Sequence, residues 1–198
     1  AGAWPSYTVS IAITPNDSGQ VVGTGTFAQG SEVTLNAQPG VNHKFVNWTN
    51  DSNPLSAENP YTFNLSSNLE ITANFVETFS LSISAGQGGT VSPTEIHNYT
   101  NGTSVPISAT PNTGYSFNSW NGDGVSDPSQ KSTTVLMTAN RSISATFSIN
   151  SHSLEISTTG QGTVTQSGSG DYDYGSNPTI SATPASGYSF SHWVGNGI

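Results

Sequence analysis

The chain of 198 residues contains no cysteine and a single methionine, Met137. Without cysteine, neither a disulfide nor a thiolate-bound metal can hold the fold together. Charged residues make up only 8% of the sequence, and three cations stand against twelve acidic residues, which gives a formal net charge of -9. A phosphate backbone is bound through clusters of Lys and Arg, so this balance excludes nucleic acid as an expected partner.

Long apolar runs are also missing. No stretch approaches the roughly 18 to 20 apolar residues that cross a bilayer as a helix, so the sequence predicts no membrane insertion. The first residues lack the charged and apolar regions of a secretion signal, and any such signal is expected outside this sequence. Ser, Thr, Asn and Gly are abundant instead, which is typical of secreted bacterial β proteins.

A repeat of about 72 residues runs through the chain. Tryptophans recur at intervals of 72 and 73 residues, and phenylalanine, alanine, proline and glycine keep the same register around them. The positions in register include Trp48, Trp120 and Trp193; Phe45, Phe117 and Phe190; Ala37, Ala109 and Ala182; Pro39, Pro111 and Pro184; Gly30, Gly102 and Gly175. Self-similarity at this period indicates tandem copies of one small module.

The repeat predicts a lead segment over residues 1–6 and modules over residues 7–77, 79–149 and 152–198. Linkers of one or two residues leave neighbouring modules little freedom, so the modules are expected to form an elongated rod. The third module lacks the segment that runs from about residue 125 to residue 147 in the second. We therefore expect this module to be incomplete at its C-terminal end.

Apolar and polar residues alternate within each repeat, most clearly at Val105, Ile107 and Ala109 of the second. A period of two residues predicts half-buried β-strands. Between these segments lie glycine and asparagine, as at Asn101 and Gly102, which favour turns with positive φ. No segment has a helical period, so the predicted fold class is all-β, with about six strands in each module.

One segment of the second repeat, residues 102–123 with the ending Ile143-Ser-Ala-Thr-Phe147, resembles the divergent internalin-type B-repeat of bacterial surface and secreted proteins. The first repeat carries the same pattern at residues 30–51, and the third carries it at residues 175–195 without the ending. The resemblance implies β-grasp-like modules, used in strings that display or space other domains. It also implies an extracellular or cell-surface location and no catalytic residues.

The tryptophans Trp48, Trp120 and Trp193 are candidate ligand-binding residues, because flat aromatic faces stack on sugar rings. Simple alternation places Trp120 on the same strand face as the polar residues Ser116 and Asn118, which favours exposure. A row of exposed tryptophans would bind polysaccharide multivalently. The alternative is a bulge or turn after Asn118 that returns each tryptophan to the core.

Two acidic residues, Asp123 and Asp127, lie in an oxygen-rich segment that superficially resembles a calcium loop. The segment lacks the full alternating set of ligands and the terminal glutamate, so capping of a turn by aspartate is the alternative. No other cofactor is expected. The four histidines share no register, and no motif combines a nucleophile with a base, so we expect no enzymatic activity.

Three residues of the third repeat, Ile180, Ala182 and Phe190, are a candidate assembly edge. They lack the two strands that cover or pair with their counterparts in the second repeat. An open sheet edge with apolar neighbours is a template for another strand. The third module is therefore completed either by residues beyond Ile198 or by a strand from another chain.

These observations predict a non-catalytic extracellular repeat segment that acts as a stalk, spacer or scaffold of a bacterial surface or secreted protein. The first alternative is an adhesion module that binds carbohydrate or protein through exposed aromatic residues. The second is a fibre subunit in which a donated strand completes the third module. The expected partners are neighbouring repeats or domains of the same protein, polysaccharide, or another copy of the chain.

Overall fold

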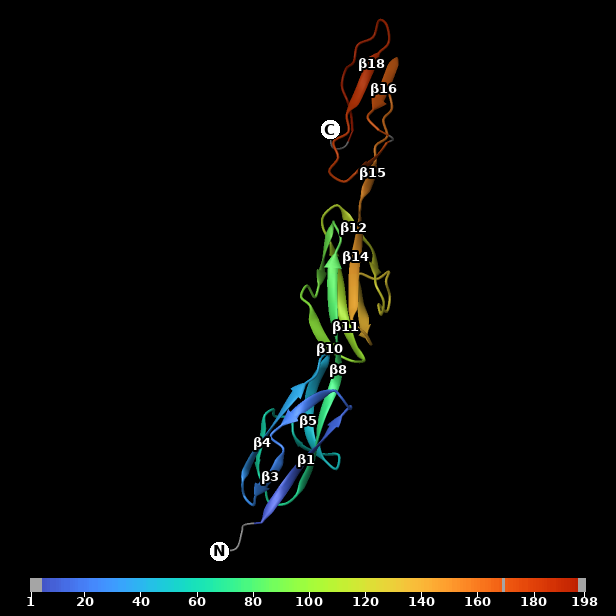
Figure 1. Cartoon of the computed structure of the whole chain (residues 1–198). Helices are drawn as coiled ribbons and strands as arrows, with labels where there is room; N and C mark the ends of the chain where they lie inside the picture. Colours follow the sequence, from blue (N-terminus) through green and yellow to red (C-terminus); the bar gives the residue numbers. More distant parts are fainter. Residues whose placement is uncertain (1–4, 169, 196–198) are drawn as a thin grey trace.

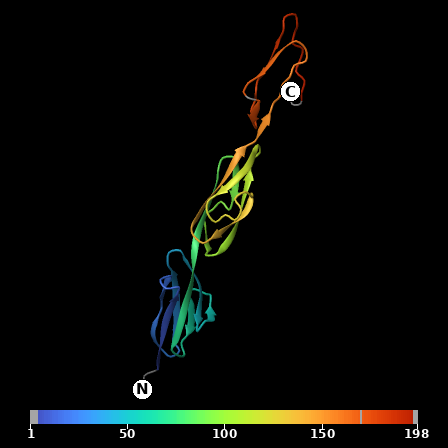
Figure 2. The same cartoon turned by 90° about the vertical axis from the view of Figure 1, so that its right-hand side faces the viewer.

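A computed structural model of the chain describes residues 5–168 and 170–195, so most of the lead segment predicted over residues 1–6 lies outside the described residues. Within the described ranges every regular element is a β-strand, which confirms the all-β class. These residues accordingly include no apolar helix of the length needed to cross a membrane. In Figures 1 and 2, module 2 lies between modules 1 and 3.

Module 1 is a sandwich of two β-sheets. Its strands are β1 (Ser6–Thr14), β2 (Gly19–Val22), β3 (Gly25–Ala28), β4 (Glu32–Pro39), β5 (His43–Asn50), β6 (Asn53–Ser56), β7 (Tyr61–Asn64) and the first half of β8 (Leu69–Ala85). The larger sheet has the order β6-β5-β8-β1-β3, and the smaller has the order β2-β4-β7. Strands β1 and β8 run parallel in the middle of the larger sheet.

Module 2 repeats this arrangement. Its strands are the second half of β8, β9 (Gly89–Ser92), β10 (His97–Thr100), β11 (Thr103–Pro111), β12 (Tyr115–Asn121), β13 (Ser132–Met137) and β14 (Arg141–Ile149). The larger sheet has the order β12-β14-β8-β10, and the smaller has the order β9-β11-β13. In both modules the last strand lies in the interior of the larger sheet, parallel to the first strand and antiparallel to the strand that carries the tryptophan.

The core of each module lies between its two sheets. Along β4, buried Val33, Leu35 and Ala37 alternate with exposed Glu32 and Thr34, as the period of two predicts. The buried residues of module 1 are Val9, Val33, Leu35, Ala37, Trp48, Leu65, Ile71, Ala73 and Phe75, and those of module 2 are Leu81, Val105, Ile107, Ala109, Trp120, Val135, Met137, Ile143 and Ala145. Modules 1 and 2 thus each have a hydrophobic core of their own.

Modules 1 and 2 have more strands than the six or so expected. The additional ones are short, and β10 carries His97, Asn98, Tyr99 and Thr100, a sequence without apolar alternation. This strand forms because β8 offers it a hydrogen-bonding edge. The resemblance led us to expect a β-grasp-like module, and the observed module is a parallel central pair of strands packed against a three-stranded antiparallel sheet.

Strand β8 belongs to two modules at once (Figure 1). Residues 69–77 pair with β1 and β5 of module 1, and residues 78–85 pair with β10 and β14 of module 2. The sequence predicts a short linker at Thr78. The structure instead places Thr78 inside the strand, where it is buried, so no flexible segment separates the two modules.

Module 3 contains two separate pairs of strands in the range 151–195, leaving aside residue 169. They are β15 (Ser151–Ser153) with β17 (Asp171–Asp173), and β16 (Gly162–Gln166) with β18 (Ile180–Pro184). Residues 154–156 and 189–193, which match the second half of β8 and strand β12, form no strand. No strand lies between them among the described residues, so neither segment has the partner that its counterpart has in module 2.

Candidate functional site

The tryptophans of the first two modules are core residues. Trp48 is 0% exposed and Trp120 is 3% exposed. The exposure that simple alternation predicts is therefore wrong for both residues. In this conformation neither indole ring has a face available for stacking on a sugar.

A β-bulge in the strand explains the difference. The register of β12 against β14 shifts between Phe117 and Ser119, so that Asn118 is an extra, exposed residue. The same shift occurs in β5 between Phe45 and Asn47. An extra residue reverses the inward and outward alternation, so aromatic residues three positions apart point to the same face. The alternative, a bulge or turn that returns the tryptophan to the core, is the one observed for Trp48 and Trp120.

Each buried tryptophan also anchors a loop. The indole Nε1–H of Trp48 donates to the backbone carbonyl of Glu58 at 2.9 Å, and that of Trp120 donates to the carbonyl of Gln130 at 2.9 Å. Their rings pack beside Phe45 and Phe117, with centroids 4.9 Å and 5.8 Å apart. This geometry stabilises the module through apolar burial and a satisfied polar group.

The acidic pair is placed on the surface of module 2. Asp123 and Asp127 are both exposed, and the Oδ1 of Asp127 accepts hydrogen bonds from the backbone N–H of Ser129 at 2.9 Å and from its hydroxyl at 2.7 Å. These hydrogen bonds lower the pKa of Asp127 below its ordinary value. In the described part of the chain no group of three or more His, Cys, Asp or Glu side chains could hold a metal ion. Asp127 caps a turn in this geometry, and calcium binding stays a prediction.

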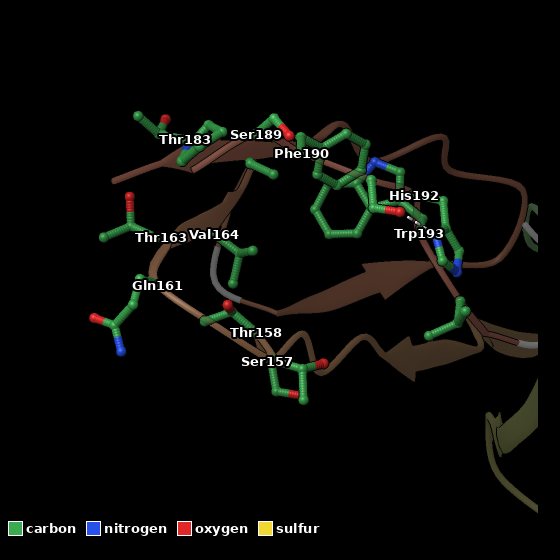
Figure 3. Close-up of a pocket in the computed structure, with 16 residues that line it drawn as sticks. Ser157, Thr158, Gln161, Thr163, Val164, Thr183, Ser189, Phe190, His192 and Trp193 are labelled. Atoms are coloured by element: carbon green, nitrogen blue, oxygen red, sulfur yellow. Dashed lines mark hydrogen bonds between the residues drawn. The ribbon is translucent and has the colours of Figure 1, made fainter. Parts of the chain in front are cut away.

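The candidate assembly edge lies beside a groove in module 3 (Figure 3). The groove encloses about 190 Å³, and its lining includes Val164 and Ala182 from the paired strands and Phe190 and Trp193 from the unpaired segment. Figure 3 shows Phe190 and Trp193 along one side and Ser157 and Thr158 along the other. Ile180 and Ala182 are half-buried, whereas their counterparts Ile107 and Ala109 are buried.

The third tryptophan differs from the other two. Trp193 is half-buried, and its neighbour Phe190 is 47% exposed. Their ring centroids still lie 5.3 Å apart, which is within the range of the pairs in modules 1 and 2. The two rings are therefore packed against each other although the segment that carries them forms no strand.

Sequence reasoning missed a glycine in the groove. Gly162 pairs with Pro184 as Gly19 pairs with Pro39 and Gly89 pairs with Pro111. The different spacing between β2 and β4 hides this equivalence in the first repeat, although Gly89 and Gly162 do share the register of the tryptophans. The structure reveals it through the pairing of the strands.

Comparison with known proteins yields one match. A family model described as the divergent InlB B-repeat domain matches residues 9–78, 79–151 and 152–197, which together span nearly the whole chain. Among curated proteins and among solved structures, no match to the chain was found.

Proposed function

The chain belongs to the divergent InlB B-repeat family, and from this premise we propose that it is a non-catalytic spacer within a bacterial surface or secreted protein. In this role the modules hold other domains at a fixed distance and orientation. The observation that carries the proposal is β8, which passes from the core of module 1 into the core of module 2 without a break. A hinge would require residues free to change φ and ψ, and every residue of β8 from Leu69 to Ala85 is in extended conformation.

Backbone hydrogen bonds support a stiff first junction. The N–H of Thr78 donates to the carbonyl of Asn42 in module 1 at 2.7 Å. The N–H of Asn101 in module 2 donates to the carbonyl of Glu77 at 2.9 Å, and its side-chain amide donates to the Glu77 carboxylate at 3.1 Å. The segment between the modules is thus held from both sides.

The second junction repeats this arrangement. The N–H of Asn150 donates to the carbonyl of Gly114 at 2.8 Å, and the N–H of Tyr174 donates to the carbonyl of Asn150 at 2.7 Å. The Tyr174 ring packs so closely on Gly114 that a Cβ atom on this glycine would overlap it. Two junctions with equivalent hydrogen bonds favour a regular array, and the elongated rod remains part of the proposal.

Distance measurement between two spin labels tests the stiffness of the first junction. The absence of native cysteine allows labels at Ser66→Cys in module 1 and Ala139→Cys in module 2, both at exposed loop positions. The two labels lie near the ends of the stretch of β8 that runs from Leu69 to Leu81. A strand rises about 3.3 Å per residue, so the labels are expected about 40 Å apart. We expect a narrow distance distribution, which a Gly-Ser-Gly-Ser insertion after Thr78 broadens.

The matched control carries the same insertion after Glu95, in the exposed loop between β9 and β10 of module 2. This control is expected to keep the narrow distribution, because the loop lies outside β8 and outside the hydrogen bonds described for the junction and for Trp120. A broad distribution in the protein without any insertion contradicts the spacer proposal. A distribution that the insertion after Thr78 leaves narrow contradicts the role assigned to β8.

Recognition of polysaccharide or protein through exposed aromatic residues is a second candidate function. It is favoured only in module 3, where Tyr188 is 60% exposed and Phe190 is 47% exposed. Trp48 and Trp120 do not support it, because their rings are buried.

A further inference from the structure

We propose that the groove of module 3 is a binding site for an extended, uncharged peptide segment with apolar residues at alternate positions and an aromatic residue at the last of them. Such a segment would occupy the place that residues 69–77 of β8 occupy in module 1 and that β14 occupies in module 2. The proposal goes beyond the spacer function, since a rigid array could exist with or without such a site.

Modules 1 and 2 show what belongs in the groove. In module 2, β14 forms a parallel ladder with residues 81–85 and an antiparallel ladder with β12. Residues 154–156 and 189–193 of module 3 correspond to these two neighbours, and neither forms a strand. The N–H of Leu154 donates to the carbonyl of Gly170 at 2.6 Å, on the side where β10 lies in module 2, so among the described residues the opposite edge has no strand beside it. Residues 157–159, which follow this first segment, line the groove together with residues 189–194. Unpaired N–H and C=O groups on both sides of a gap are a template for one inserted strand.

The apolar surface of module 3 indicates the same occupant. Leu154 is half-buried where its counterpart Leu81 is buried, and Trp193 is half-buried where Trp120 is buried. In module 2 these side chains share a core with Ile143 and Ala145 of β14. An occupant with the pattern Ile-x-Ala-x-Phe would cover this surface, since burial of apolar area is the main source of stability in such a module.

Gly162 explains why the last apolar residue of the occupant should be aromatic. In module 1 a Cβ atom added to Gly19 would overlap the ring of Phe75, and in module 2 one added to Gly89 would overlap the ring of Phe147. Both rings belong to the strand that closes the module. For a Cβ atom added to Gly162, the three nearest atoms are backbone atoms of the paired strand and none belongs to an aromatic ring. The position beside Gly162 would therefore accept an aromatic ring from the occupant.

The lining of the groove explains the lack of charge in the occupant. Among the described residues that line it, His192 is the only one with a titratable side chain. A charged side chain pointing inward would lose its hydration without gaining a partner of opposite charge. The residue at the alanine position of the pattern Ile-x-Ala-x-Phe must also be small, because Ala73 and Ala145, which occupy this position in modules 1 and 2, are each 0% exposed.

The test uses the 198-residue protein and a synthetic peptide with the sequence of residues 142–149 of β14, which leaves out the charged Arg141 and has both ends capped. We expect saturable binding of one peptide per chain and a roughly tenfold slowing of amide exchange in residues 154–156 and 189–193. Amides of module 1 should exchange at an unchanged rate. Because the variants are made in the peptide, the folding of the protein is not altered.

Two variant peptides probe the specificity. Replacing the residue that corresponds to Ala145 by glutamate, or the one that corresponds to Phe147 by serine, is expected to weaken binding by at least about tenfold. Equal binding of the three peptides, or no slowing of exchange with the parent peptide, overturns the proposal. Dimers of the protein alone, with residues 189–193 already protected from exchange, would show that a second copy fills the groove and would also overturn it.

Discussion

Replacement of Trp120 by alanine is predicted to unfold module 2. The indole is 3% exposed, packs beside Phe117 and donates its N–H to the carbonyl of Gln130 at 2.9 Å. Truncation of a buried tryptophan to alanine costs about 3–5 kcal/mol of folding free energy. A single hydrophobic core of this size rarely supplies more than about 3–5 kcal/mol, so the loss is comparable with the whole stability of the module.

Amide hydrogen exchange resolved along the chain is the appropriate assay, because an array of modules need not unfold in one step. In Trp120→Ala we expect the amides of β11 and β14 to lose their protection while those of β4 keep most of theirs. Trp120→Phe retains an aromatic ring and loses the hydrogen bond to Gln130, so its cost is expected to be smaller.

Trp193→Ala is the matched comparison, because this ring has the same sequence register and is only half-buried. Its effect on exchange in module 3 is expected to be clearly smaller than that of Trp120→Ala in module 2. Protection of module 2 that survives Trp120→Ala, or equal effects of the two substitutions, would refute the assignment of Trp120 as a core anchor.

Two further predictions concern the turn at Asp127 and the shared strand β8. Hydrogen bonds from Ser129 lower the pKa of Asp127 in the folded protein, so their stabilising contribution is present at neutral pH and is lost as the pH falls through that lowered value. An NMR titration should show this low pKa in the parent and a shift toward the ordinary value in Ser129→Ala. Leu81→Ala and Ile143→Ala remove equally buried side chains from the core of module 2, each at a cost of about 2–5 kcal/mol. Only Leu81 lies on the strand shared with module 1, so amide exchange in module 1 should accelerate more in Leu81→Ala.

Much of the fold could be predicted from the sequence. Alternation locates strands such as β4 and β11 because their buried residues are all apolar and their exposed residues are mostly polar. The repeat sets the number of modules, since the tryptophans keep one register. Both features depend on local periodicity, which a sequence displays directly.

The placement of the tryptophans could not be predicted in the same way. A bulge at Asn118 is an adjustment of backbone pairing between β12 and β14, and no residue type at that position requires it. The continuity of β8 was also hidden, because the apparent boundary at Thr78 marks a change of partners within one strand. Pairing across a sheet is decided by tertiary contacts, which alternation along one segment does not encode.

The location of the last strand of each module explains both the array and the groove. A strand at the edge of a sheet pairs with one neighbour only. Residues 69–77 of β8 in module 1 and β14 in module 2 instead lie between two strands, and each forms backbone hydrogen bonds with both of them. The described part of module 3 contains the pairs β15–β17 and β16–β18, and neither pair includes such a strand. The last strand of module 1 runs without a break into the first strand of module 2 as β8, and β14 is separated from β15 by Asn150 alone. At the first junction one segment therefore completes a module and begins its neighbour, so completion of module 1 and the stiffness proposed for this junction have the same physical origin.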